Sequence, residues 1–233
     1  MFYVKNFLTA IVAAMFLLTT VAHAEDADTY FQCGKAYYLQ QQYEQAIAEY
    51  NRAIEINPNH AKAYNGRGVA YYHLKNYEQA FADFDRAIAA APNFIYPYTG
   101  RACLYLDTKQ YDLAIQDCTK AIELNPNYAM AYYNRSLVYL DMEKFEQTIQ
   151  DCNKAVELDP NYAVAYGNRA VAYYHLKNYE RAIQDLNTAI EIGFNVKDLG
   201  EALYWRGMCH KATGDDAKAQ FDLDKAKKLG YSG

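Results

Sequence analysis

The sequence has few of the residues from which catalytic and redox sites are commonly built. Only two of its 233 residues are serines, Ser136 and Ser232, and neither lies in a hydrolase nucleophile-elbow pattern. No glycine-rich loop suited to cradling a phosphate is present, and the five cysteines include no Cys-x-x-Cys pair. The composition therefore predicts a protein that is not an enzyme.

An excess of positive charge is also missing. With 23 basic and 28 acidic residues, the formal net charge is −5, which gives no electrostatic reason to bind nucleic acid or an anionic membrane. No cysteine and histidine residues have the close spacing of a zinc site. We therefore expect no metal, no cofactor and no nucleic acid partner.

No apolar run reaches the roughly 20 residues that a membrane-spanning helix needs. The longest, residues 7–21, follows Lys5 and precedes the small-x-small sequence Ala22-His23-Ala24. This order predicts a signal peptide over residues 1–24, cleaved after Ala24, and hence an exported chain. An uncleaved membrane anchor is the alternative; after cleavage we expect no membrane insertion.

Proline is scarce but regularly placed. Four of the five prolines lie 34 residues apart, and each closes a version of the phrase Ala-Ile-Glu-Leu-Asn-Pro-Asn, seen at residues 121–127. A fixed period between about 20 and 50 residues indicates an array of structural repeats. These prolines are Pro58, Pro92, Pro126 and Pro160.

Each unit reads as two helices joined by a short turn. In residues 61–94 the pattern predicts a first helix over 61–74, a turn at Lys75-Asn76 and a second helix from Tyr77 to about Ile88. Pro92 lacks an N–H group and ends the second helix. The residues expected to face one another are Tyr64, Gly68 and Tyr71 of the first helix, and Tyr77, Ala80, Phe84 and Ala87 of the second.

The same positions recur along the chain. Counted from the first residue of each 34-residue repeat, such as Ala61, tyrosine stands at the fourth and eleventh places and a small residue at the twentieth. This pattern resembles the tetratricopeptide repeat (TPR) family. The resemblance implies an all-α fold, a right-handed α-solenoid of about six helix-turn-helix repeats over residues 25–233. The repeats would span residues 27–60, 61–94, 95–128, 129–162, 163–199 and 200–230, the last acting as the C-terminal cap.

In this family the first helices of the repeats line a concave groove, so the resemblance also implies a candidate peptide-binding surface. An apolar and aromatic groove suits an amphipathic helix or an extended peptide. The alternative is that several of these side chains are half-buried between repeats; we favour binding for Tyr133 and Trp205. For Asn134 and Asn168 the candidate role is binding to a peptide backbone, but we favour the alternative that they are ordinary solvated asparagines. The candidate groove residues are Lys62, Asn65, Tyr96, Met130, Tyr133, Asn134, Leu137, Asn168, Tyr204 and Trp205.

Three further patterns have structural interpretations. Arginine at the seventh place and aspartate at the twenty-third recur in unit after unit, which predicts ion pairs that fix the repeat geometry rather than an anion site. Cys118 and Cys152 replace core aromatics and are expected to be buried, whereas Cys103 lies on the groove wall and is the candidate reactive thiol. The tyrosines at the fourth, eleventh and seventeenth places are expected to pack in the core.

Two functions fit these observations. The first is a monomeric, exported (periplasmic or secreted, bacterial) adaptor that binds a protein or peptide segment in its groove. The second is a structural subunit that docks by its convex face or its ends in an envelope or secretion complex. Family members that clamp C-terminal carboxylates carry lysine, asparagine and arginine at set groove positions; here the first such register reads Phe31, Lys35, Gly66, Tyr96 and Gly100, so we expect no carboxylate clamp.

Overall fold

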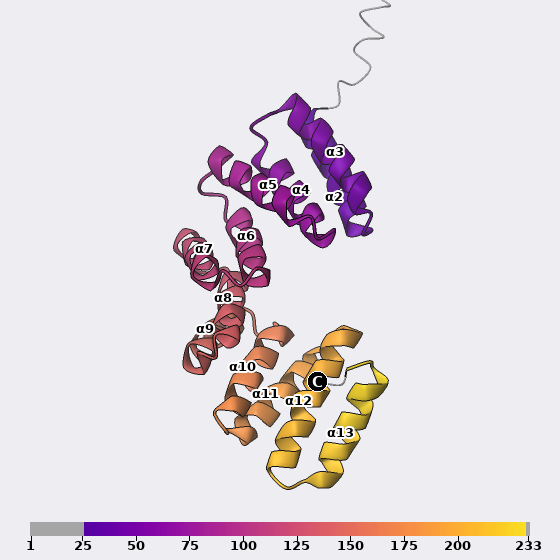
Figure 1. Ribbon diagram of the computed structural model, residues 1–233, viewed down its shortest axis with the longest axis vertical. Coiled ribbons are helices and arrows are strands. Elements are labelled where there is room, and N and C mark those ends of the chain that lie inside the picture. The colour runs from indigo at the N-terminus through magenta and orange to yellow at the C-terminus, as the bar shows by residue number, and fades with distance from the viewer. Residues whose placement is uncertain (1–25, 232–233) are drawn as a thin grey trace, which may run out of the picture. The chain divides into compact units, whose positions relative to one another are not determined.

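The computed structural model describes residues 26–231, and the predicted signal peptide lies outside these described residues. Within the described range the chain forms twelve α-helices and no strand, which confirms the all-α prediction (Figure 1). None of the helices between residues 26 and 231 has both the length and the apolar character needed to cross a membrane.

The chain divides into two compact units, each made of helix pairs in the predicted order. Unit 1 ends at Ala91 and contains α2 (Ala27–Leu39), α3 (Tyr43–Ile56), α4 (Ala61–His73) and α5 (Tyr77–Ala90). Unit 2 begins at Pro92 and contains α6 (Tyr96–Asp107), α7 (Tyr111–Leu124), α8 (Ala129–Asp141), α9 (Phe145–Leu158), α10 (Ala163–His175), α11 (Tyr179–Ile192), α12 (Val196–Ala212) and α13 (Asp216–Lys228). The repeat pattern predicts one solenoid over residues 25–233. Whether the two units continue one solenoid depends on how they join, so this part stays a prediction.

Small residues let the two helices of a repeat approach closely, as the sequence predicts. Ala80 and Ala87 of α5 are fully buried, and a methyl group built on Gly68 of α4 would lie 3.0 Å from the Phe84 ring. A larger side chain at either contact would separate the helices, because protein interiors are close-packed. In unit 2 the first helices α6, α8, α10 and α12 also pack on one another in sequence, so their outward faces form one continuous side of that unit.

The turn inside each repeat requires a residue in the left-handed region. Lys75 has a φ of 58°, and the residues 34 positions before and after it, Gln41 and Lys109, have φ values of 59° and 58°. The backbone there reverses direction within three residues, so α4 ends at His73 and α5 begins at Tyr77. In the last repeat a glycine, Gly214, has taken this place with a φ of 83°.

The predicted Arg–Asp ion pairs are present in five repeats. In each, the guanidinium makes two parallel hydrogen bonds to one carboxylate; for Arg135, Nε donates to Asp151 Oδ2 at 2.7 Å and Nη2 donates to Oδ1 at 2.8 Å. Arg135 Nη1 also donates to Thr119 of the preceding repeat at 3.1 Å, so the arginine joins three helices. The five pairs are Arg67–Asp83, Arg101–Asp117, Arg135–Asp151, Arg169–Asp185 and Arg206–Asp222.

The core prediction is confirmed for the two cysteines and for two of the tyrosines, Tyr64 and Tyr98, whereas most of the other tyrosines expected in the core are only half-buried. Cys118 and Cys152 are fully buried, and Tyr98 is buried with its hydroxyl donating to the Pro92 carbonyl at 2.9 Å. The expectation of a core position is wrong for Tyr37, whose side chain is 37% exposed. Tyr37 lies in α2, the first helix of the described chain.

Candidate functional site

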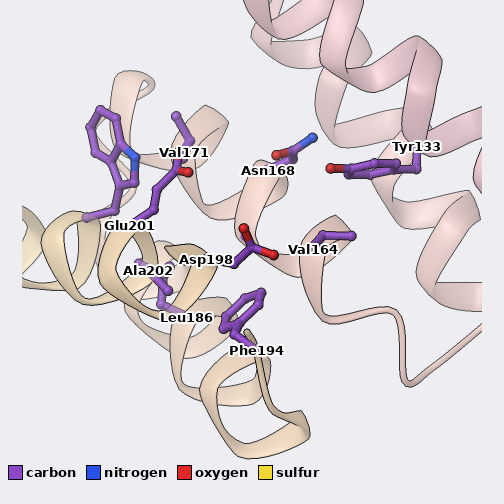
Figure 2. Close-up of a pocket in the computed structure, with 11 residues that line it drawn as sticks. Tyr133, Val164, Asn168, Val171, Leu186, Phe194, Asp198, Glu201 and Ala202 are labelled. Atoms are coloured by element: carbon purple, nitrogen blue, oxygen red, sulfur yellow. The ribbon is translucent and has the colours of Figure 1, made fainter. Parts of the chain in front are cut away.

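The side of unit 2 formed by its first helices contains a cavity of about 80 Å³. Figure 2 shows Val164 and Phe194 on one side of it, with the Tyr133 hydroxyl and the Asp198 carboxylate directed toward Asn168. Three helix pairs contribute to this cavity, so it depends on the stacking of successive repeats. Its walls are formed by Tyr133, Val164, Gly167, Asn168, Val171, Leu186, Phe194, Asp198, Glu201, Ala202 and Trp205.

Helical spacing explains how α10 and α12 build most of the cavity wall. Residues at i, i+3, i+4 and i+7 of a helix share one face. In α10 this series runs through residues 164, 167, 168 and 171, and in α12 it runs through residues 198, 201, 202 and 205. Each helix therefore presents a two-turn stripe to the cavity, and Leu186 of α11, which is 1% exposed, closes the floor between them.

The break in the 34-residue period supplies the rest of the wall. Gly193 ends α11 with a φ of 109°, a left-handed conformation that glycine adopts without strain. Asn195 then caps α12: its Oδ1 accepts a hydrogen bond from the Asp198 backbone N–H at 3.1 Å. The cap starts α12 at Val196, four residues before the predicted start of the sixth repeat at Gly200, and this additional turn carries Asp198 into the cavity wall.

Two side-chain donors at the cavity lack a protein partner. The Asn168 Nδ2 amide and the Trp205 Nε1–H are both buried, and neither has a hydrogen-bond partner among residues 26–231. Each such group costs about 1–3 kcal/mol when it stays unpaired. The pair therefore lowers the stability of the empty site by about 2–6 kcal/mol in total.

The place of Asn168 in its repeat explains why its amide is unpaired. Asn134 occupies the same place one repeat earlier, and its Nδ2 lies 3.6 Å from the Cys103 sulfur, a weak acceptor. The residue 34 positions after Cys103, at the same place in the next repeat, is Leu137, whose side chain has no acceptor atom. Asn168 therefore lacks the interaction available to its counterpart.

The remaining polar groups of the cavity are a phenol and two carboxylates. Burial, followed by the nearby Tyr162 and Asp198, raises the pKa of Tyr133 well above its usual value, so its hydroxyl remains a donor at neutral pH. The Tyr133 ring packs against Tyr162 with centroids 5.1 Å apart. Asn195 Nδ2 donates to one oxygen of Asp198, Oδ2, at 2.6 Å.

Only some of the predicted groove residues meet at this cavity. Tyr133, Asn168 and Trp205 line it, and Tyr204 packs edge-on against Trp205 with ring centroids 5.5 Å apart. Elsewhere in unit 2, Tyr96 and Met130 are 49% and 44% exposed. Tyr128 connects these two, because its ring meets Tyr96 edge-on and its hydroxyl lies 3.2 Å from the Met130 sulfur. Leu137 of α8 is half-buried.

The structure corrects the expectations for Asn134 and Cys103. Asn134 is only 8% exposed, and its Nδ2 lies 3.6 Å from the Cys103 sulfur, so its amide has a partner inside unit 2. Burial, with a smaller contribution from Asp107, raises the pKa of the Cys103 thiol to about 11. A thiol that is protonated at neutral pH is a poor nucleophile, so Cys103 is not activated.

Lys62 and Asn65 belong to unit 1. Lys62 is exposed on α4 beside a hollow that Asp28 and His60 also line. Asn65 is half-buried, and its Oδ1 atom is buried without a partner in the described chain. Neither residue is among those that line the cavity of unit 2.

The cavity residues Phe194 and Asp198 lie in or next to the insertion, where the regular 34-residue period assigns no position. The sequence signal for both is the insertion at residues 193–195, which interrupts the period immediately before them. Among the described residues no group of three histidine, cysteine, aspartate or glutamate side chains is arranged to hold a metal ion.

Solved structures share this architecture. A structure of PilF from Pseudomonas aeruginosa superposes with a TM-score of 0.77 at 23% identity, covering 87% of this chain and 91% of that one. The Cut9–Hcn1 assembly of the APC/C gives 0.81 at 17% identity, covering 97% of this chain and 43% of that one. YrrB, described as a TPR protein with an unusual peptide-binding site, gives 0.57 at 26% identity, covering 81% and 95%.

Sequence comparison identifies the family. No curated protein matches the sequence significantly. Models of the tetratricopeptide repeat match residues 61–94, 95–128, 129–162, 163–193 and 201–229, and a further TPR repeat model matches residues 34–75. These matches cover most of the chain, with the helix pairs and the Arg–Asp ladder in the same register, and the chain belongs to the tetratricopeptide repeat family.

Proposed function

We propose that this protein is a non-enzymatic scaffold that binds an extended segment of a protein partner along the first helices of unit 2. The observation that carries this proposal is the pair of buried, unpaired donors, Asn168 Nδ2 and Trp205 Nε1, among the residues that line the cavity. An extended peptide offers a backbone carbonyl at every residue, which is the acceptor that these donors lack.

The energetics favour a bound peptide over a structural role for these groups. In the free protein these donors have no acceptor among the described residues, and a peptide carbonyl would supply one on binding. The floor of Val171, Leu186 and Ala202 offers apolar contact to one aliphatic side chain of the peptide. Burial of such a side chain contributes about 1.5–3 kcal/mol, so the hydrogen bonds and the apolar contact together provide an anchor.

The similarity to YrrB supports a peptide as the ligand. YrrB is described as a TPR protein with an unusual peptide-binding site, and this chain is 26% identical to it. Here the atypical element is the insertion that places Phe194 and Asp198 at the cavity.

We also propose that the scaffold acts after export, as a monomer. The support is the order of Lys5, the apolar run 7–21 and Ala22-His23-Ala24 in the sequence. Mass spectrometry of the protein from its native host tests this: an N-terminus at Glu25 is the expected result, and a chain that retains residues 1–24 contradicts cleavage.

A second candidate function is docking by the C-terminal end. Phe221 of α13 is 66% exposed and lies beside a hollow lined by Ile183 and His210. Exposed aromatic side chains are common interface anchors, so this surface favours the assembly subunit. Light scattering separates the two candidates: a particle that grows with concentration supports assembly, and a constant monomer supports the adaptor.

The cavity itself can be tested with two substitutions at one position. A methyl group built on Gly167 meets only Phe194 at 3.9 Å, so Gly167→Ala is tolerated and leaves most of the cavity open. Gly167→Leu extends the side chain into the same space. Both raise the helix propensity of α10, so neither is expected to unfold the protein.

We expect Gly167→Ala to capture the same partners as the wild-type protein from the native exported fraction. Gly167→Leu should lose the partners that bind the cavity, while its circular dichroism spectrum stays helical. Partners that bind all three proteins equally would place the functional surface elsewhere.

A further inference from the structure

The charged residues of the cavity wall are all acidic. Asp198 and Glu201 both line it, and no lysine or arginine is among the lining residues. Neither carboxylate forms an ion pair with another residue in the part of the chain that the structure describes. Asp185, one helix away, shows the contrast, because Arg169 binds it with two hydrogen bonds of 2.7 Å.

The unpaired carboxylates select the charge of a ligand. Asp198 is half-buried and Glu201 is exposed, and two adjacent negative charges attract a cation and repel a further anion. Asn195 Nδ2 takes one oxygen of Asp198, Oδ2, which leaves Oδ1 for a ligand. Lys197, the nearest lysine in sequence, is exposed and is not part of the cavity wall.

The Trp205 donor and the two carboxylates lie on one face of α12 in a fixed order. Glu201 precedes Trp205 by four residues and Asp198 precedes it by seven, which corresponds to about 6 and 10 Å along the axis of α12. In an extended peptide, side chains on the same face are about 6–7 Å apart. If a backbone carbonyl of the peptide accepts the hydrogen bond of the Trp205 indole, a peptide side chain about two residues from that carbonyl therefore reaches Asp198 and Glu201.

We propose that the peptide recognised by this cavity is cationic: an internal, extended segment with an aliphatic residue in the cavity and a lysine or arginine two residues away, bound to Asp198 and Glu201. This inference rests on the proposed function and specifies its ligand. The unpaired donors bind the backbone of the segment, the apolar floor takes its aliphatic side chain, and the carboxylates determine its charge.

Random dodecapeptides displayed on phage test this inference. The library is selected on the wild-type protein, on Asp198→Asn/Glu201→Gln, and on Asp216→Asn/Asp224→Asn. The last variant makes the same change in net charge on α13, whose residues do not line the cavity. Peptides that also bind Gly167→Leu are discarded as not specific for the cavity.

We expect the wild-type and α13-variant pools to be enriched in lysine and arginine two residues from an aliphatic residue, and the Asp198→Asn/Glu201→Gln pool to lose this bias. A capped synthetic peptide from the wild-type pool should bind this double variant about tenfold more weakly than it binds the wild type, because a charge-assisted hydrogen bond is lost. Replacing the basic residue of the peptide by glutamine should have a similar effect.

The two proposals fail in different ways. A wild-type pool without basic residues, or a basic bias that the double variant retains, overturns the cationic ligand and leaves the peptide-binding function in place. If no peptide prefers the wild-type protein to Gly167→Leu, the proposed function fails, and the cationic ligand fails with it.

Discussion

Single atoms distinguish the candidate binding residue from its structural counterpart in the neighbouring repeat. Asn134 and Asn168 share the same place in the repeat, but only Asn134 has a sulfur acceptor within 3.6 Å. The exchange of Cys103 for Leu137 one repeat later leaves the Asn168 amide without an acceptor. A side chain kept in an unfavourable environment is typical of a functional site, where binding restores the missing interaction.

At this scale we predict that Asn168→Leu stabilises the free protein while it weakens peptide binding. Removing a buried, unpaired amide should raise the free energy of unfolding by about 1–3 kcal/mol, as measured by urea denaturation. Asn153→Leu is the control, because Asn153 accepts a hydrogen bond from Arg169 Nη1 at 2.7 Å and its loss should not stabilise. A clear loss of stability in Asn168→Leu would show that its amide is satisfied.

At the scale of helices and repeats, the bidentate Arg–Asp pairs hold the first and second helices of each repeat together. Asp151 is 4% exposed, and the two hydrogen bonds from Arg135, acting against a smaller effect of burial, raise the pKa of that arginine. Removing one partner leaves a buried charge uncompensated, whereas removing both leaves an apolar contact.

We therefore predict that Arg135→Met destabilises the protein by about 3–5 kcal/mol and that Arg135→Met/Asp151→Leu recovers most of this loss. Urea midpoints of the two variants provide the measurement. Lys154→Met, which removes the exposed pair with Glu157, should change the midpoint little. A double variant as unstable as the single one would mean that the pair itself, rather than the orphaned carboxylate, determines the loss.

The repeat period predicts the helices far better than it predicts the site. Helix ends, the Arg–Asp pairs and the buried places of Cys118 and Cys152 follow from a pattern shared by most repeats, so each copy reinforces the others. The cavity depends on residues that differ from one repeat to the next. Phe194 and Asp198 enter through an insertion, and the environment of Asn168 depends on Leu137, a residue 31 positions earlier in the preceding repeat.

At the scale of the whole molecule, burial keeps several thiols and phenols neutral. It raises the pKa of Cys103 to about 11 and those of Cys209 and Tyr50 to about 12, and, despite an opposing hydrogen bond from Ser136, that of Cys152 to about 12. The groups lie in both units, so their titration affects the entire protein. All five cysteines are free, and the Cys118 and Cys152 thiols do not form a disulfide.

We predict a loss of stability in alkali. The raised pKa values mean that the unfolded chain loses these protons first, so the contribution of the thiols is complete only below the unfolded cysteine pKa of about 8.5 and is lost as the pH rises toward 11–12. Urea midpoints at pH 7, 9 and 10.5 should fall slightly between the first two and more steeply between the last two. Replacing the buried cysteines by alanine should flatten the decline below pH 10, and a midpoint that stays constant up to pH 10.5 would contradict the prediction.

The most direct test of the peptide-binding cavity uses Trp205, the only tryptophan in the sequence. Its indole N–H gives a single resonance in a two-dimensional nitrogen–proton spectrum, which can be followed while a capped, selected peptide is added. The account predicts that this resonance shifts and saturates together with the backbone signals of α10 and α12, and that Gly167→Leu shows no shift. A peptide that binds while the indole resonance stays in place would contradict the central claim that the cavity takes the ligand.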